Sequence, residues 1–286
     1  MTFSIVAADM AADAGPEWGV AVASKFLAVG AAVPWARAGV GAVATQAFAN
    51  LAYGPDGLAL LDGGREAAEV AAALTDADPD SAHRQLGIVD RSGRPATFTG
   101  DECLEWAGGV TGANHCCQGN ILASPDVVTS MTAAFEEKNG ALADRLMAAL
   151  VAGYEAGGDR RGMQSAALLV VREGGGYMGG NDRAIDLRVD DHPDAVHELV
   201  RLVDLHRLYF PPPGSLEFLP LDDGLAAEVR GHLRALGSDV GEGSGYDESL
   251  RHSLFAWMGA ENLEERWSED PRIDRTVLEH LRRAAS

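Results

Sequence analysis

The chain begins Met1-Thr2-Phe3-Ser4-Ile5-Val6-Ala7, an apolar run that predicts a β-strand and carries a hydroxyl residue directly behind the initiator methionine. Methionine is normally removed when the next residue is small. Removal would place a hydroxyl group and a free α-amine on Thr2, and an α-amine with a pKa of about 7.7–8.0 is a usable base near neutral pH. Thr2 is therefore a candidate nucleophile for amide hydrolysis. The alternative is that Thr2 is only the first residue of a strand.

Length and composition indicate a globular protein. With 286 residues, of which 47 % are hydrophobic, the chain is long enough for one large domain and a small one. Its sequence contains neither an apolar run of about 18 residues nor the basic start of a signal peptide, so we expect a cytoplasmic protein without membrane partners. The formal charge of −20 would repel phosphate backbones and argues against nucleic-acid partners. Three cysteines form neither a disulfide framework nor a metal-binding spacing.

Strand and helix signals alternate in blocks along the first 210 residues. Short β-branched or alanine-rich runs separated by Gly, Pro and Asp predict strands, and amphipathic segments predict helices. The predicted strands are 3–8, 18–23, 28–33, 40–44, 84–89, 95–99, 116–122, 164–171 and 185–189. The predicted helices in this part are 55–61, 65–74, one that begins near Ser124-Pro125, 142–154 and 194–208.

This order predicts an α+β fold in which two antiparallel sheets pack face to face between outer helix layers, a four-layer αββα sandwich. Residues 1–210 would form this domain. The Pro-rich segment 211–214 cannot continue a compact helix and predicts a stiff linker. Residues 215–286 would form a small all-α module, with helices at 225–236, 247–258 and 275–283 and with Trp257 and Trp267 in its core.

Lys25 is one of only two lysines in the chain and ends the predicted second strand. If that strand pairs with the first, Lys25 lies beside Thr2. A buried cation there would lower the pKa of the α-amine and favour its neutral, basic form. Lys25 is therefore the second candidate catalytic residue. The alternative is a lysine at a strand end that extends its ammonium group to water.

Two further segments contain candidates for an oxyanion hole or a substrate-binding surface. Thr45 and Gln46 close a predicted strand where a turn would expose backbone N–H groups, and such donors stabilise a developing oxyanion. Gln118 and Asn120 are amides inside an otherwise apolar stretch, and buried amides need hydrogen-bond partners. These amides either line a polar site or hold loops together.

The segment Gly157-Gly158-Asp159-Arg160-Arg161-Gly162-Met163-Gln164-Ser165 joins a predicted helix to a strand. Its glycines allow backbone to approach a ligand, and Asp159 with Arg161 could orient a carboxylate or the amine, so we add Asp159, Arg161, Gln164 and Ser165 to the candidate site. The alternative is an ordinary helix end with solvated charges. Asp190-Asp191-His192-Pro193-Asp194 has spacing that a divalent ion would tolerate, but helix capping explains it equally well, and we predict no metal.

Five segments together resemble a family of uncharacterised bacterial proteins that is assigned to the N-terminal-nucleophile (Ntn) hydrolase superfamily. They are Thr2 with the first strand, 18–25 with the pair Ser24-Lys25, 39–46, 118–122 and 157–170. The resemblance covers residues 1–210 and implies the αββα sandwich and a nucleophile exposed by processing, a role that only Thr2 matches. Proteasome subunits of the superfamily carry an acidic residue near the position of Lys25. Residues 233–237 and 257–267 resemble a peptidoglycan-binding-like module that often follows this family.

The function predicted from the sequence is hydrolysis of a small amide or peptide-like substrate, without a cofactor, by Thr2 and its α-amine. A non-catalytic binding or assembly protein with the same fold is one alternative, and a sensor of cell-wall fragments (muropeptides) is another. The alanine-rich segment 67–73 can pack closely against a second copy, so we also expect a homodimer.

Overall fold

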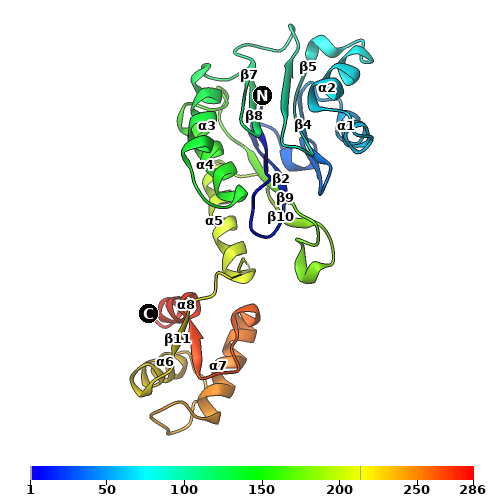
Figure 1. Ribbon diagram of the computed structural model, residues 1–286. Coiled ribbons are helices and arrows are strands. Elements are labelled where there is room, and N and C mark those ends of the chain that lie inside the picture. The colour runs from blue at the N-terminus through cyan, green and yellow to red at the C-terminus, as the bar shows by residue number, and fades with distance from the viewer. Residues whose placement is uncertain (1, 213) are drawn as a thin grey trace. The chain divides into compact units, whose positions relative to one another are not determined.

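The computed structural model describes residues 2–212 and 214–286, which form two compact units that divide between Leu202 and Val203 (Figure 1). The division falls inside helix α5 (Ala195–Tyr209). Met1 and Pro213 lie outside the described residues. The structure therefore does not test the removal of Met1, and it describes the predicted linker 211–214 only in part. The two units are described separately.

A six-stranded antiparallel sheet forms the centre of the N-terminal unit, with the strand order β10-β9-β2-β1-β8-β7. Its strands are β1 (Thr2–Asp9), β2 (Glu17–Ser24), β7 (Gly108–Gly112), β8 (His115–Asn120), β9 (Ser165–Val171) and β10 (Arg183–Val189). β1 and β2 form a hairpin, and β1 is buried along almost its whole length because neighbouring strands flank it on both edges. The first strand of the sequence therefore lies in the middle of the sheet.

A second, four-stranded antiparallel sheet has the order β3-β4-β5-β6. Its strands are β3 (Pro34–Arg37), β4 (Gly41–Ala47), β5 (Arg84–Asp90) and β6 (Pro95–Thr99). Ala42 and Ala44 of β4 share a buried cluster with Val6 and Val22 of the larger sheet, so the two sheets pack face to face. Small alanine side chains let the sheets approach at this point.

Helices cover the outer faces of both sheets (Figure 1). Against the six-stranded sheet pack α3 (Asp126–Glu137) and α4 (Leu142–Glu155), whereas α1 (Tyr53–Asp62) and α2 (Ala67–Asp76) pack against the four-stranded sheet. Short 3-10 helices occur at η1 (Val29–Ala31), η2 (Ser81–His83) and η3 (Tyr177–Gly179). The N-terminal unit is thus a mixed α/β structure in which apolar faces of helices and sheets cover one another.

The C-terminal unit is mainly helical. It contains α6 (Asp223–Ala235), α7 (Glu248–Ala260), α8 (Arg275–Ala284), η4 (Glu264–Arg266) and the last turns of α5, together with a two-stranded sheet of β11 (Phe218–Pro220) and β12 (Arg272–Asp274). Trp257 lies in its buried core, and Trp267 is partly buried against that core. The prediction of an all-α module therefore did not include the small sheet that this unit contains.

Two further elements differ from the sequence-based prediction. Residues 28–33 form no strand, because Ala28 adopts a left-handed conformation (φ 53°) and the Val29 N–H bonds to the Ser165 hydroxyl, which turns the chain into η1. The strand begins later, at Pro34. β7 was not predicted, because its sequence Gly-Gly-Val-Thr-Gly has little of the β-branched or aromatic content that marks a strand.

Candidate active site

Four polar residues form a continuous row across the end of the six-stranded sheet. Ser165, Ser24, Thr2 and Asn120 occupy paired positions on the neighbouring strands β9, β2, β1 and β8. Directly paired residues project to the same face of a sheet, and this face is turned toward the four-stranded sheet. All four residues are buried, with Thr2 at 6 % exposure and the others at 2 % or less. We call these four residues the polar row.

Hydroxyl groups are bonded along the polar row. Thr2 Oγ1 and Ser24 Oγ lie 3.1 Å apart. The Ser165 hydroxyl donates to the Phe26 carbonyl at 2.5 Å and accepts the Val29 N–H at 3.0 Å, so it fixes the loop that follows β2. The Thr2 hydroxyl is therefore held in place by a neighbouring strand that is itself anchored.

A buried amide network lies directly behind the polar row and connects the two sheets. The hydroxyl of Ser4 donates to Gln46 Oε1 at 2.7 Å and accepts from Gln118 Nε2 at 2.7 Å. Gln85 of the opposite sheet accepts from Gln46 Nε2 at 2.8 Å and from Asn120 Nδ2 at 3.0 Å. Asn120 thus belongs to both the polar row and the network. Buried amides with this many partners hold a polar region rigid inside an apolar core.

Gln118 fits between the sheets only because residue 87 is glycine. A Cβ atom at Gly87 would lie 2.2 Å from Gln118 Oε1, which is closer than nonbonded atoms can approach. Gln118 Oε1 is buried and has no hydrogen-bond partner among the described residues. This oxygen is therefore an acceptor that remains available inside the network.

The loop between α4 and β9 holds the end of β2 beside Thr2. The buried carboxylate of Asp159 accepts the backbone N–H groups of Lys25 at 2.9 Å and Arg161 at 2.8 Å. The Arg161 guanidinium donates to the Lys25 carbonyl, and the Gln164 N–H donates to the Ser24 carbonyl at 2.9 Å. Asp159, Arg161, Gln164 and Ser165 are thus gathered around Ser24 and Lys25.

Lys25 does not provide the buried cation that the sequence suggested. Its side chain is exposed, and Nζ donates to the Met163 carbonyl at 3.3 Å. The chain leaves the sheet at Ser24, so the next side chain extends along the α4–β9 loop toward solvent. The structure therefore gives no support to a Lys25 ammonium that tunes the Thr2 amine.

Thr45 also lies apart from the polar row. Successive residues of a strand point to opposite faces, so Gln46 faces the larger sheet while Thr45 faces the helices, on the same side as Val43. Its hydroxyl donates to the Asn50 carbonyl at 3.0 Å, and its N–H donates to the Val33 carbonyl at 3.2 Å. Thr45 therefore does not share the face that carries Thr2 and its N–H is already bonded, so the structure gives no support to Thr45 as an oxyanion donor.

Three residues of this region were not singled out from the sequence. Ser4 lies two residues after Thr2 on a strand and therefore shares its face, a relationship that alternation alone predicts. Ser24 was noted only beside Lys25. Gln85 is a lone glutamine in an apolar strand, the same signal that had drawn attention to Gln118.

Two non-glycine residues with positive φ lie at the ends of the strands that carry Gln46 and Asn120. Ala47 (68°) is the last residue of β4, and Ile121 (52°) directly follows β8. Such conformations often accompany functional sites.

The buried thiols have a structural role. Cys116 and Cys117 are fully buried on β8, and burial raises the pKa of Cys116 and raises that of Cys117 to about 12. A thiol with so high a pKa is protonated at neutral pH and is a poor nucleophile. Neither of these two thiols is therefore a candidate nucleophile.

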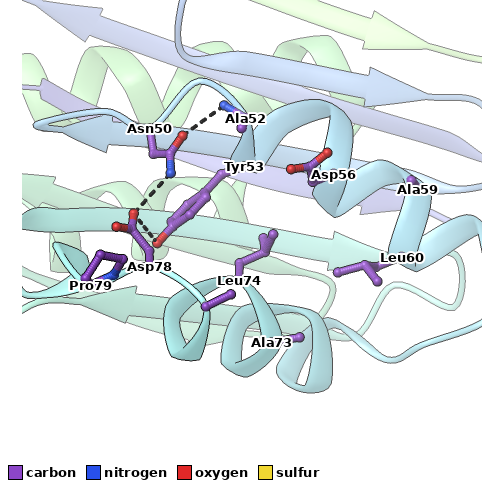
Figure 2. A pocket seen from close by; sticks show the side chains of 11 residues that line it. Asn50, Ala52, Tyr53, Asp56, Ala59, Leu60, Ala73, Leu74, Asp78 and Pro79 are labelled. Carbon is purple, nitrogen blue, oxygen red and sulfur yellow. Dashed lines mark hydrogen bonds between the residues drawn. The ribbon is translucent and has the colours of Figure 1, made fainter.

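A separate cavity of about 610 Å³ lies between α1, α2 and the loop before α1 (Figure 2). At one end the Asp78 carboxylate accepts from Asn50 Nδ2, the Tyr53 hydroxyl and Arg84 Nε, each at 3.0 Å. Because the Arg84 hydrogen bond stabilises the anion, the pKa of Asp78 lies well below its usual value. The oxygens of the Asp78 carboxylate are thus already bonded to groups of the protein. The rest of the cavity wall consists mainly of Ala and Leu side chains. This cavity lies on the outer, helix-covered side of the four-stranded sheet, away from Thr2.

Within residues 2–212 and 214–286, no group of three or more His, Cys, Asp or Glu side chains is arranged to hold a metal ion. Over the same residues, no helix is long and apolar enough to cross a membrane.

Comparison with known proteins identifies the family. The model of a family of unknown function, DUF1028, matches residues 2–199, which include the whole polar row. The chain belongs to this family. A crystal structure of a DUF1028 protein from Silicibacter pomeroyi is 33 % identical, covers 72 % of this chain and 86 % of its own, and superposes with a TM-score of 0.65. Residues 213–281 match a second model, described as "Putative peptidoglycan binding domain".

Two other comparisons add little. The structure of the Anbu (Gly-1) mutant from Hyphomicrobium sp. strain MC1 is 12 % identical and covers 76 % of this chain and 100 % of its own, with a TM-score of 0.34. At this TM-score the likeness supports no inference. The search of curated proteins gives no match.

Proposed function

We propose that the N-terminal unit is an Ntn-type amidohydrolase with a four-layer αββα sandwich, and that Thr2 is its nucleophile. The observation that carries the proposal is the position of the Thr2 hydroxyl, which heads a central strand and is bonded within a buried polar row. A hydroxyl held by a rigid second hydroxyl loses little freedom when a substrate arrives. Hydrolysis of a small amide or peptide-like substrate uses this arrangement directly.

The proposed reaction requires the α-amine of Thr2, which removal of Met1 would release. The neutral amine takes the Oγ1 proton, Oγ1 attacks the carbonyl carbon, and an ester forms as the C–N bond breaks. The protonated amine returns its proton to the leaving amine. A water molecule, deprotonated by the same amine, then attacks the ester and releases the acid and the Thr2 hydroxyl. No cofactor takes part.

Asn120 is the proposed oxyanion donor, because it pairs directly with Thr2 and its Nδ2 carries two N–H bonds. One of these groups bonds to Gln85. Such a donor is typically worth about 2.7–4 kcal/mol of transition-state stabilisation. Because Thr2 is buried, its neutral amine would be favoured over the charged form even though Lys25 is exposed, and we propose a rate that rises with pH as the amine loses its proton.

The deciding experiment combines intact mass with substitution of Thr2. Protein purified from its native host should lack Met1. Thr2→Val keeps the β-branched shape, so the fold should survive while amide turnover is lost; Thr2→Ser should retain part of it. A permanent N-terminal extension should also abolish turnover, because it converts the amine to an amide. Retention of Met1 would instead favour a non-catalytic binding or assembly protein, and full turnover by Thr2→Val would mean that the nucleophile lies elsewhere.

The C-terminal unit supports a second proposal, binding of cell-wall fragments. Its family match points to peptidoglycan, and the rings of Phe255 and Trp267 meet edge to face with their centroids 5.0 Å apart. Phe255 is 47 % exposed. Calorimetric titration with a muropeptide should detect binding by the full chain that Phe255→Ser weakens, whereas Leu236→Ser, which removes another exposed apolar side chain of this unit, should leave it intact.

We also propose that the chain forms a homodimer through α2, where Ala68 and Ala72 are exposed and small enough for close helix packing. Sedimentation should give the mass of two chains at micromolar concentration, and Ala72→Glu should give the mass of one.

A further inference from the structure

Five large apolar side chains are exposed on the loops around the end of the sheets where Thr2 lies. They are Phe26 (56 % exposed), Leu27 (58 %), Phe48 (63 %), Leu51 (51 %) and Leu104 (57 %). We call this set the apolar rim. Exposed apolar residues scattered singly are ordinary, whereas a group of them at one end of the sheets is a candidate binding surface.

Hydrogen bonds tie the apolar rim to the polar row. The Phe26 carbonyl accepts from the hydroxyl of Ser165, a member of the row. The Leu104 carbonyl accepts the N–H of Ile121 at 2.8 Å, and Ile121 follows Asn120 directly. Phe48 comes two residues after Gln46 of the amide network. The three loops therefore surround the same end of the two sheets.

The other large apolar side chains exposed on the described part of the N-terminal unit lie at the opposite end. Met10 follows the last residue of β1, while Tyr177 and Met178 lie in the connection between β9 and β10. That connection begins after Val171, which pairs with Trp18, far along the strands from Ser165 and Ser24. Met178 is 84 % exposed and offers a matched control.

Charge around the rim is mixed in sign. Lys25 precedes Phe26, whereas Glu102 and Glu105 flank Leu104. Neither positive nor negative charge therefore dominates around the apolar rim, and the property that its loops share is exposed apolar surface.

We propose that the substrate of Thr2 carries an apolar side chain next to its scissile amide, and that the apolar rim binds this side chain. The inference rests on the proposed function. Thr2 lies at the strand ends, while the residues behind it are enclosed between the sheets, so a substrate must approach between these loops. Contact with the rim removes apolar surface of both partners from water.

The test uses the full chain with Met1 removed and a panel of acetyl-Ala-Ala-Xaa coumarin amides, in which Xaa is Leu, Phe, Ala, Ser, Asp or Lys. We expect kcat/KM for Leu and Phe to exceed that for Ser by roughly 10- to 200-fold, the usual range for a small apolar group in an apolar site. The double variant Phe26→Ser, Leu27→Ser should lower kcat/KM for the Leu and Phe substrates far more than for the Ser substrate, so that most of this preference is lost. Met178→Ser should leave the whole panel unchanged.

The outcomes separate the two proposals. Hydrolysis with equal or greater kcat/KM for Ser, Asp or Lys overturns the apolar preference and leaves Thr2 as nucleophile. A preference that survives the double variant also overturns the role of the rim. Absence of hydrolysis across the panel in the wild-type chain overturns the inference, whereas the proposed function is decided by the intact mass and the Thr2 variants. Circular dichroism should show unchanged folding in the variants, since the replaced side chains are more than half exposed.

Discussion

The hydroxyl groups of Thr2 and Ser24 lie 3.1 Å apart on two adjacent central strands, and both residues are buried. Because the strands pair Thr2 directly with Ser24, the two side chains project to the same face of the sheet and their hydroxyl groups meet. The N–H of Gln164 donates to the Ser24 carbonyl, and the carboxylate of Asp159 accepts the N–H of Lys25, so the backbone directly after the Ser24 side chain is held in place. Ser24 therefore acts as a positioning residue for Thr2 in the proposed reaction.

Replacement of Ser24 by Ala should lower amide turnover by about tenfold or more, corresponding to about 1.4 kcal/mol in the barrier. The decrease should fall on kcat rather than KM, because the hydroxyl orients the nucleophile and does not touch the rim. Ser253→Ala removes a buried hydroxyl from the C-terminal unit and serves as the control. Equal kcat for Ser24→Ala and wild type would show that the Thr2 hydroxyl needs no such support.

Gln85 should be the most important single residue of the amide network for stability. Its side chain contacts Gln46, Asn120, Thr99 and the Gly119 carbonyl, so it links both sheets. Gln85→Leu would leave several buried groups without partners, at about 1–3 kcal/mol for each one left unsatisfied. We expect the free energy of unfolding in urea to fall by about 2–5 kcal/mol.

Gln164→Leu is the matched control for Gln85→Leu. Its side chain bonds to Asp191 at the surface, so its loss should change the unfolding free energy by no more than about 0.5 kcal/mol. A similar small change in Gln85→Leu would mean that the network rearranges around the missing amide.

Strand order and pairing near Thr2 could be predicted in part from sequence, because apolar runs and turn residues are local signals. The hairpin of β1 and β2 follows from two apolar runs separated by Gly15-Pro16. The pairing of β1 with β8, more than a hundred residues later, has no local signal. Asn120 could therefore be chosen as a polar residue in an apolar stretch, but its position opposite Thr2 could not.

The errors at the candidate site have physical causes. Lys25 was expected to be buried because it ends an apolar strand, yet burial ends at Ser24, where the chain turns away from the sheet. Thr45 was included with Gln46 although neighbouring strand residues face opposite sides. If the alternation of strand side chains had been applied strictly, the set of candidate site residues would have included Ser4 and not Thr45. The apolar rim has no sequence signal, because its residues come from loops whose meeting depends on the packing of both sheets.

The C-terminal unit should depend on a buried ion pair. Arg266 Nη1 donates to Asp274 Oδ1 at 2.7 Å, while Nε and Nη2 donate to the carbonyls of Leu208 and Arg207 at the end of α5. Asp274 also caps α8. Asp274→Ala would leave the guanidinium buried without its partner, and losses of about 3–5 kcal/mol are typical of such changes.

Hydrogen exchange of the full chain can locate this effect. Asp274→Ala should accelerate exchange in α8 and leave β1 and β2 protected, since these strands belong to the other unit. Glu228→Ala removes the partner of Arg282 in an ion pair that is much more exposed than Arg266–Asp274, and it should alter exchange in α8 much less. Unchanged protection of α8 in Asp274→Ala would show that the pair does not stabilise the unit.

His115 should make the N-terminal unit less stable in mild acid. The imidazole is buried against Phe135, Nδ1 lies 3.0 Å from the Ala113 carbonyl, and Nε2 has no partner among the described residues. Burial lowers its pKa below the usual 6.5, and Arg145 contributes in the same direction, although the Ala113 carbonyl and Glu136 oppose the shift.

Below pH 6.5 the unfolded chain therefore binds a proton that the folded chain does not. The free energy of unfolding must fall as the pH decreases from 6.5 toward the folded-state pKa, and it is fully retained above 6.5.

Urea unfolding at pH 7.5 and pH 5.5 measures this contribution as a difference between proteins. His115→Gln cannot titrate, so it should lose less stability than wild type between the two pH values, even if it is less stable at both. The control is His252→Gln, because His252 is exposed in the C-terminal unit and its replacement should leave the pH dependence of wild type unchanged. An identical loss of stability in wild type and His115→Gln would show that the buried imidazole gains a proton as readily in the folded chain as in the unfolded one.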